Sequence, residues 1–286
     1  HHRILECNTE GRVLRRFGIG MADLIDGPGE HAAFRYPRSL ALDRHNLYVA
    51  DTGNHALRRI NLLSGQVDTV IGTGRQGDVV EGVLAQPGGS PLSQPTALAL
   101  ADNRLLFSQA GDNRIWSYDL GRCTLEHLAG SGSLELRDGG AMLAAFAQPD
   151  ALLAVQRVLY VCDALSSSVR TVQLRDGVVQ TLVGQGMSQW GHADGERAQA
   201  RLQFPQALAM EPGSPWLWIA DAGNGALRRL RLGGGELTTV ELPRPLHGIA
   251  GLAAAGGVIW IADTEGNALL RYDPGTGEIA DVPIGQ

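Results

Sequence analysis

The chain has 286 residues, of which 44% are hydrophobic and 19% are charged. This composition excludes a disordered or low-complexity chain and is sufficient for a large core. Arginine supplies all 24 basic residues, and the formal net charge is −6, which disfavours binding to phosphate backbones or anionic lipid surfaces. The 38 glycines, without a period of three, indicate many turns and no collagen.

The cysteines and the apolar runs bear on redox chemistry and location. Cys7, Cys123 and Cys162 are too few and too scattered for a disulfide framework and form no CxxC pair. Each lies in an apolar stretch, where we expect a small buried side chain. No apolar run is long enough to span a membrane and no signal peptide opens the chain, so we expect no membrane contact and a cytoplasmic protein. The missing signal peptide carries less weight, because the chain begins in the middle of a repeat.

The first predicted elements are two strands within residues 1–18. Residues 1–5 match residues 54–58, and residues 11–18 match the fourth strand of a unit that recurs later. We interpret 1–18 as the outer strands of an incomplete unit, and the chain as a piece of a longer protein. His1 and His2 could also be the end of an expression tag, although the continuing match to the repeat favours native sequence.

The first complete unit spans residues 19–72. After a long connector, Pro37 opens an apolar strand, and a second apolar strand at 47–51 ends in Ala-Asp. A turn of small residues leads to a basic, alternating strand at 56–60, and a fourth strand follows at 66–71. Short strands separated by Gly, Asp and Asn turns predict four antiparallel strands joined by hairpins.

The same unit recurs at 73–130, 131–184, 185–242 and 243–286. The acid that ends the second strand is kept in four of the five units; this column reads Asp51, Gln109, Asp163, Asp221 and Asp263. Four-stranded units repeated every 40 to 60 residues are typical of a β-propeller. The sequence therefore predicts one all-β domain, a six-bladed β-propeller with four antiparallel strands per blade and one blade incomplete.

The direction of the strands predicts where a ligand would bind. The first strand of each blade should line the axis, where only small side chains fit. Because the first and third strands of a blade run the same way, the long connectors and the turns after the Ala-Asp pairs lie on one side of the disc. We call this side the connector face.

The motif at 47–58, which contains Asn54-His55-Ala56-Leu57, resembles the NHL repeat, with one inserted residue in the Asn-His-Leu stretch. The connectors add a second feature, Asp-Gly followed by Ala-x-Phe or Ala-x-Leu and then Pro, as in Asp26-Gly27, Phe34 and Pro37. They are similar to those of NHL-repeat proteins that carry a thioredoxin-like domain ahead of the propeller. The resemblance implies that any thiol chemistry would reside in such a neighbouring domain.

The recurring charged residues suggest structural roles. An Asp at a tight turn accepts backbone N–H bonds and fixes a hairpin. Equivalent residues of symmetric blades also spread around the ring and do not converge on one point. We therefore expect structural turn residues at Asp51, Asp163, Asp221 and Asp263. Basic residues of the third strands, such as Arg58 and Arg170, should pair with these acids between blades.

The best candidates for binding are the residues that differ from blade to blade at the mouth of the axial channel. They enter the inner strands from the connector face and are Arg38, Thr96, Asp150, Gln206 and His247. Trp190 and His192 lie in an unusual connector, where an exposed tryptophan would suit a partner or ligand. A polar mouth could equally reflect solvent access alone.

Two other function classes stay open. Six-bladed propeller lactonases and lyases hold calcium or zinc at the channel mouth, for which this chain offers Asp150, Gln206 and His247, with His192 or His31 from connectors. The histidines form no HxH or HExxH motif, and spacing identifies no Ser-His-Asp set. RNA binding, known for some NHL domains, calls for a basic face with aromatic platforms, whereas aromatics make only 5% of this chain. We therefore predict a non-catalytic scaffold for a protein partner or small ligand, with no cofactor, no metal and no catalytic residue.

Overall fold

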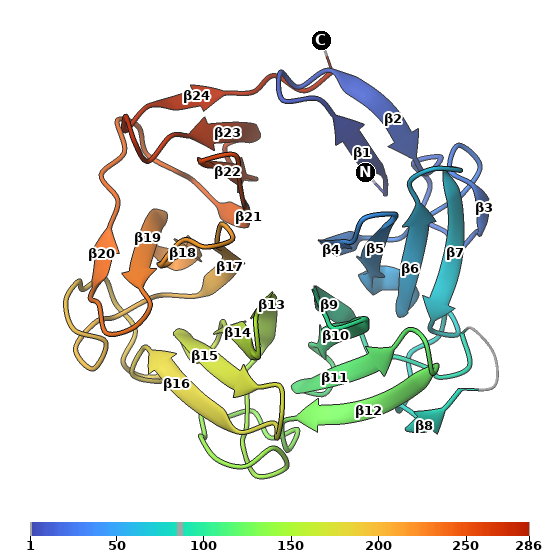
Figure 1. Cartoon of the computed structure of the whole chain (residues 1–286), viewed down its shortest axis with the longest axis horizontal. Coiled ribbons are helices and arrows are strands. Elements are labelled where there is room, and N and C mark those ends of the chain that lie inside the picture. The colour runs from blue at the N-terminus through green and yellow to red at the C-terminus, as the bar shows by residue number, and fades with distance from the viewer. Residues whose placement is uncertain (1, 85–87, 286) are drawn as a thin grey trace.

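The chain folds into a ring of β-sheets, which the computed structural model describes for residues 2–84 and 88–285. These residues form 24 strands and two 3-10 helices, Thr52–Asn54 and Ala222–Asn224. Figure 1 shows the sheets standing side by side around a central axis. The prediction of an all-β β-propeller is confirmed. Within the described residues, no helix is long and apolar enough to cross a membrane.

Five of the sheets are blades of four antiparallel strands, which follow one another in sequence from the axis outward. Blade 1 contains β4 (Pro37–Leu42), β5 (Asn46–Asp51), β6 (Ala56–Asn61) and β7 (Gln66–Ile71), and blade 2 contains β9 (Pro95–Ala101), β10 (Arg104–Gln109), β11 (Arg114–Asp119) and β12 (Thr124–Ala129). Blade 3 contains β13 (Pro149–Val155), β14 (Val158–Asp163), β15 (Ser168–Gln173) and β16 (Val179–Val183), and blade 4 contains β17 (Pro205–Ala209), β18 (Trp216–Asp221), β19 (Ala226–Arg231) and β20 (Leu237–Thr239). Blade 5 contains β21 (Ile249–Ala255), β22 (Val258–Asp263), β23 (Ala268–Tyr272) and β24 (Ile279–Asp281).

The number of blades differs from the six expected. Among the described residues, only five sheets contain the four strands of a complete blade, and β1 (Ile4–Cys7) and β2 (Val13–Phe17) form a separate two-stranded sheet. This sheet stands between blade 5 and blade 1 (Figure 1). Two further short strands, β3 (Gly27–Pro28) and β8 (Gly82–Val83), come from connectors and pair with the outer edges of blades 1 and 2.

The turn between the second and third strands ends in the same way in every blade. It ends in a residue with a left-handed conformation, where φ is positive and where Gly and Asn are the least strained residues. These residues are His55 (φ 50°), Asn113 (φ 53°), Ser167 (φ 50°), Gly225 (φ 58°) and Asn267 (φ 55°). The turn follows the end of each second strand, where four of the five blades carry the recurrent acid.

The core lies between neighbouring blades. Ala97 and Leu106 of blade 2, for example, pack in one buried cluster with Leu159 and Val161 of blade 3 and with Phe146 of the connector between them. Small side chains on the inner strands let the sheets approach near the axis, and larger ones fill the wider gap further out. Burial of these apolar faces therefore ties each blade to the next.

The cysteines are only partly as expected. All three are free; Cys162 is buried, Cys7 is half-buried and Cys123 is exposed. The prediction of a buried side chain is wrong for Cys123, because this residue occupies the turn between β11 and β12 with a positive φ of 53°. Burial raises the pKa of the Cys162 thiol well above its ordinary value.

Candidate functional site

The recurrent acid of blade 1 is fully used by the fold. Asp51 is completely buried, and its Oδ1 accepts the backbone N–H of Arg35 at 2.7 Å. Its Oδ2 accepts Asn54 Nδ2 and Arg58 Nη1, each at 2.8 Å. The other guanidinium nitrogen of Arg58 donates to Asp26 of the connector at 2.7 Å. Burial raises the pKa of Asp51, and these hydrogen bonds oppose the rise.

The same buried guanidinium recurs in blades 3 and 4. Arg58, Arg170 and Arg228 are all fully buried. The matching ion pairs are Arg170 with Asp163 and Asp138, and Arg228 with Asp221 and Asp194. The expected pairing between blades is wrong, because the strand that ends in the acid and the strand that carries the arginine are neighbours in one sheet. These side chains are partners of one another and lie away from the axial channel.

The predicted mouth residues occupy one special backbone position. Where Pro37 pairs with Asp51 and Ser39 with Ala50, Arg38 is left out of the ladder as a β-bulge. Thr96, Asp150 and Gln206 are skipped in the same way in blades 2, 3 and 4. A bulge turns its side chain out of the regular alternation. All four residues line a central cavity of about 590 Å³ formed by the inner strands.

The chemistry of this mouth is mixed and polar. Asp150 Oδ2 accepts Gln148 Nε2 at 2.8 Å, whereas Asp150 Oδ1 is buried and has no hydrogen-bond partner among the described residues. Burial raises the pKa of Asp150, and the positive charge of Arg38 opposes the rise. Thr96 Oγ1 lies 3.1 Å from Ser108 Oγ within the blade. An acid, a guanidinium and an amide around one cavity can hold a polar ligand by hydrogen bonds.

His247 does not occupy the equivalent position in blade 5. Ile249 pairs with Asp263 and Gly251 with Ala262, so the bulge falls on Ala250. His247 belongs to the connector, with its side chain 57% exposed and its Nδ1 3.5 Å from Asp263 Oδ2. It lines a smaller hollow of about 260 Å³ that shares Gln206 with the central cavity. The prediction of His247 as a fifth mouth residue is therefore wrong in register.

The other candidate residues lie apart from the mouth. Trp190 is 54% exposed, as a contact residue would be. His192 Nε2 lies 3.0 Å from Thr239 Oγ1 of the outermost strand of blade 4. The side chain of His31 is 73% exposed beside Glu30. In the described part of the chain, no three His, Cys, Asp or Glu side chains are grouped closely enough to hold a metal ion.

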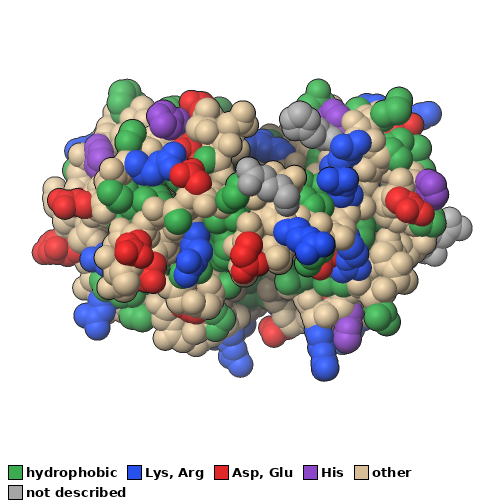
Figure 2. All heavy atoms as spheres, turned by 90° about the horizontal axis from the view of Figure 1, so that it is seen from above, with side chains coloured by type: hydrophobic (Ala, Val, Ile, Leu, Met, Phe, Trp, Pro, Cys, Tyr) green, Lys and Arg blue, Asp and Glu red, His purple; other side chains and the backbone are tan. Residues whose placement is uncertain are grey.

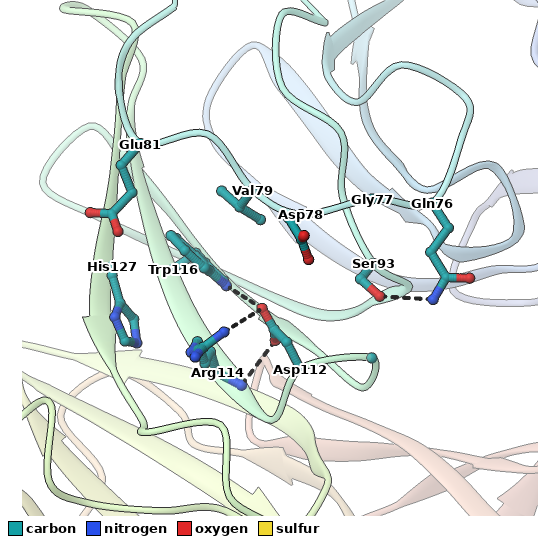
Figure 3. A pocket seen from close by; sticks show the side chains of 11 residues that line it. Gln76, Gly77, Asp78, Val79, Glu81, Ser93, Asp112, Arg114, Trp116 and His127 are labelled. Carbon is teal, nitrogen blue, oxygen red and sulfur yellow. Dashed lines mark hydrogen bonds and ion pairs between the residues drawn. The ribbon is translucent and has the colours of Figure 1, made fainter.

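Blade 2 carries a pocket that the sequence analysis did not identify. Its cavity of about 440 Å³ lies between the connector after blade 1 and the edge of blade 2 (Figure 3). The ionisable and aromatic side chains that line it are Asp78, Glu81, Asp112, Arg114, Trp116 and His127. The sequence carries one sign of this pocket: blade 2 has Gln109 where the second strands of the other blades end in an aspartate.

The local network of blade 2 is rearranged around this pocket. Gln109 takes the place of the buried acid, and its Oε1 accepts the backbone N–H of Ser93 at 2.6 Å. Asp112 Oδ2 accepts a hydrogen bond from Gln109 Nε2 at 2.9 Å and another from Trp116 Nε1 at 3.1 Å. The amide and the acid have thus exchanged positions relative to Asp51 and Asn54. Burial raises the pKa of Asp112, and these hydrogen bonds oppose the rise.

Comparisons with known proteins agree with the repeat. The family model of the NHL repeat matches residues 34–60. NHL repeat-containing protein 2 of Bos taurus is 34% identical over 257 residues, which is 80% of this chain and 35% of that protein. The chain thus spans about a third of the length of this relative. The resemblance to NHL-repeat propellers is confirmed.

Solved structures share the fold at low identity. A chain of the nidogen/laminin complex superposes with a TM-score of 0.66 at 16% identity, over 98% of this chain and 92% of that one. A streptogramin B lyase superposes with a TM-score of 0.61 at 12% identity, over 100% of this chain and 74% of that one. At such identities the likeness concerns the propeller alone.

Proposed function

We propose that this chain, an NHL-repeat β-propeller, is a non-catalytic binding module that holds a protein partner or a small ligand on its connector face and at its channel mouth. One observation carries the proposal. The recurrent acids and arginines of blades 1, 3 and 4 are tied to one another inside the sheets, whereas Arg38, Asp150 and Gln206 differ between blades and border the central cavity. Residues that the fold does not use for itself are the ones available to a ligand.

No specific observation favours the two other function classes. A metal-dependent hydrolase or lyase needs several ligands in one place, and none of the described residues form such a group. The streptogramin B lyase is a neighbour in fold only. An RNA-binding propeller needs a basic face, whereas on the edge of the disc seen in Figure 2 arginines lie among Asp and Glu side chains.

We further propose that β1 and β2 are the outer half of an incomplete sixth blade. His2 supports this, because its Nδ1 accepts the backbone N–H of Tyr36 at 3.1 Å just as His55 Nδ1 accepts that of Gln94 at 3.1 Å. His2 also has a left-handed backbone, with φ 54° against 50° for His55. In the full-length protein we expect a thioredoxin-like domain beside the propeller, and a cytoplasmic location stays a prediction.

The binding proposal is tested by replacing the mouth residues while leaving the recurrent network intact. We would substitute Arg38→Ala, Asp150→Asn and Gln206→Ala together, and compare capture of cross-linked partners and retained small molecules from the source cells by mass spectrometry. A matched variant would carry Arg122→Ala, Asp43→Asn and Gln66→Ala, which lie at turns or strand starts on the opposite side of the disc. Loss of the same partner or ligand from the mouth variant alone supports the proposal. Equal capture by both variants, or turnover of a substrate that Asp150→Asn abolishes, contradicts it.

A further inference from the structure

In three blades, one position near the connector is filled by a guanidinium of the chain itself. In blade 1, Arg58 Nη2 donates to Asp26 Oδ1 at 2.7 Å and to the carbonyl oxygen of Ile25 at 2.8 Å. The guanidinium carbon lies 5.0 Å from the centre of the Phe34 ring. Thr69 completes the arrangement by donating its N–H and its hydroxyl to Asp26, each at 3.0 Å. Arg170 with Asp138 and Arg228 with Asp194 repeat the pair at 2.7 and 2.6 Å.

The register shows what blade 2 has at the same places. Arg58 pairs with Val49 and Thr69 in blade 1, and Trp116 pairs with Phe107 and His127 in blade 2. Trp116 therefore replaces the arginine, and His127 replaces the threonine. Gly82 pairs with Leu125 as Gly27 pairs with Val67, which places Glu81 at the position of Asp26. Blade 2 has kept the connector acid and lost its cation.

The acids of this blade 2 pocket lack the partners that their counterparts have. Within the described residues, Glu81 and Asp78 make no ion pair and no side-chain hydrogen bond, whereas Asp26, Asp138 and Asp194 each pair with an arginine. With Asp112 they place three carboxylates around the cavity, against the single guanidinium of Arg114. Arg114 is itself directed to Asp112, at 4.0 Å, and to the carbonyl oxygen of Ser131, at 3.2 Å. The local excess of negative charge favours a cation.

The rest of the lining selects a flat cation. Trp116 is 4% exposed and is fixed by its bond to Asp112 and by the ring of His127, whose centre is 5.0 Å away. Among aromatic side chains an indole attracts a guanidinium most strongly, and the part of the Trp116 ring that borders the cavity is the surface that a ligand would meet. His127 also lines the cavity, and its Nε2 is buried and has no hydrogen-bond partner among the described residues. A planar group with several N–H donors uses these features better than an ammonium does.

We propose that the blade 2 pocket binds a guanidinium group carried by an arginine side chain of a protein partner. The group lies in the hollow beside the indole that replaces the chain's own arginine of blades 1, 3 and 4, with Glu81 as the ion-pair partner and Trp116 as the stacking surface. Asp78 borders the same hollow from the connector (Figure 3). This inference deepens the proposed function and rests on it for the nature of the partner.

The first test uses three blocked tripeptides, acetyl-Gly-Arg-Gly-amide and its lysine and citrulline versions, titrated by NMR. Citrulline has nearly the shape of arginine but carries no charge. We expect shifts confined to residues around the blade 2 pocket, with arginine binding several-fold tighter than lysine and citrulline not binding. Equal binding of citrulline and arginine, or no binding of the arginine peptide, overturns the inference.

Two variants test which residues act. Glu81→Gln with Asp78→Asn should weaken binding of the arginine peptide by about fivefold or more, the scale of two partly exposed ion pairs. The control is Glu30→Gln with Glu135→Gln, which removes the same charge from other connectors and should leave affinity within twofold. Equal affinity of the two variants contradicts the role of the pocket acids.

A second design fills the site from within. Gln109→Asp, Asp112→Asn, Trp116→Arg and His127→Thr together give blade 2 the residues of blade 1, so the chain's own guanidinium should occupy the position. We expect a folded variant with no peptide binding; retained binding would overturn the inference. If the arginine peptide fails to bind the unchanged chain while the mouth substitutions still abolish partner capture, this inference fails and the proposed function stands.

Discussion

Replacement of Arg170 by leucine tests whether the buried guanidiniums hold each connector to its blade. Arg170 is fully buried and donates to Asp163 at 3.1 Å, to Asp138 at 2.7 Å and to the carbonyl oxygens of Ala145 and Arg137, both at 3.1 Å. It thereby joins the connector to the second and third strands of blade 3. Arg170→Leu would leave the carboxylate of Asp163 buried without its cation.

The expected loss of stability follows from the fact that the ion pair is buried. Breaking a buried ion pair from one side costs about 3 to 5 kcal/mol. With an unfolding entropy of about 2.1 cal/mol/K per residue, this corresponds to a fall in Tm of roughly 5 to 8 °C for a chain of 286 residues. The control is Arg59→Leu, because Arg59 pairs with Asp68 at 3.1 Å but is 44% exposed, and such surface pairs contribute at most about 1 kcal/mol.

The assay is urea unfolding at pH 7.5, followed by circular dichroism and by tryptophan fluorescence, with a thermal melt beside it. A second variant, Arg170→Leu with Asp163→Asn, removes the stranded charge and should recover part of the lost free energy of unfolding. The reasoning is refuted if Arg170→Leu and Arg59→Leu reduce the free energy of unfolding equally, or if the double variant is no more stable than Arg170→Leu.

Three further predictions concern local features of the same fold. Asp150→Asn should raise the free energy of unfolding by roughly 1 kcal/mol at pH 8. Because burial raises the pKa of Asp150 in the folded chain, its ionisation begins to weaken the fold above the ordinary pKa of an aspartate and does so fully above the raised pKa, so the gain should vanish as the pH falls towards 4. An equal gain at both pH values in urea titrations would contradict this. Gly184→Ala should lower the free energy of unfolding by about 1 to 3 kcal/mol more than Gly186→Ala. Both glycines have a φ near +106° to +109°, but a Cβ at 184 would lie 2.5 Å from the carbonyl oxygen of Ser167, whereas one at 186 meets nothing. Equal melting temperatures of the two variants would refute the contact argument. A thiol reagent should modify exposed Cys123 in the folded protein and buried Cys162 only on unfolding, so peptide mapping that finds Cys162 labelled first would be inconsistent with the fold.

The fold could be read from the sequence because its main determinants are local. Pro37, the Ala50-Asp51 pair and the turn at His55 specify one hairpin, and the same spacing in later units implies the same structure. Arg38, Asp150 and Gln206 could be placed at the mouth because each directly follows the proline that opens its inner strand. His247 was misplaced because blade 5 has its proline four residues before the strand, so the position of Asp263 in the ladder decides the register and the proline does not.

The pocket of blade 2 could not be derived in the same way. Its cavity depends on a substitution of Trp116 for an arginine and on how the connector at Asp78 and Glu81 folds over that side chain. Gln109 shows that blade 2 differs from the other blades. The sequence does not say whether neighbouring side chains fill the space around the position of the lost arginine or leave a cavity there. The pairing of Arg58 with Asp51 also needed the sheet register, since the sequence alone does not say whether an arginine pairs with the acid of its own unit or with that of a neighbouring unit.

The bulge at the start of each inner strand lets the side chain at the channel mouth differ between blades while the strand pairing stays the same. One residue per blade stands outside the hydrogen-bonded ladder, while its neighbours on both sides keep their pairing. Exchanging Arg38, Thr96, Asp150, Gln206 or Ala250 therefore alters what the channel presents without changing any strand register. Each of the five sites can be exchanged without disturbing the ladder of its blade, so a repeat ring of fixed architecture can acquire a new specificity through very few codon changes.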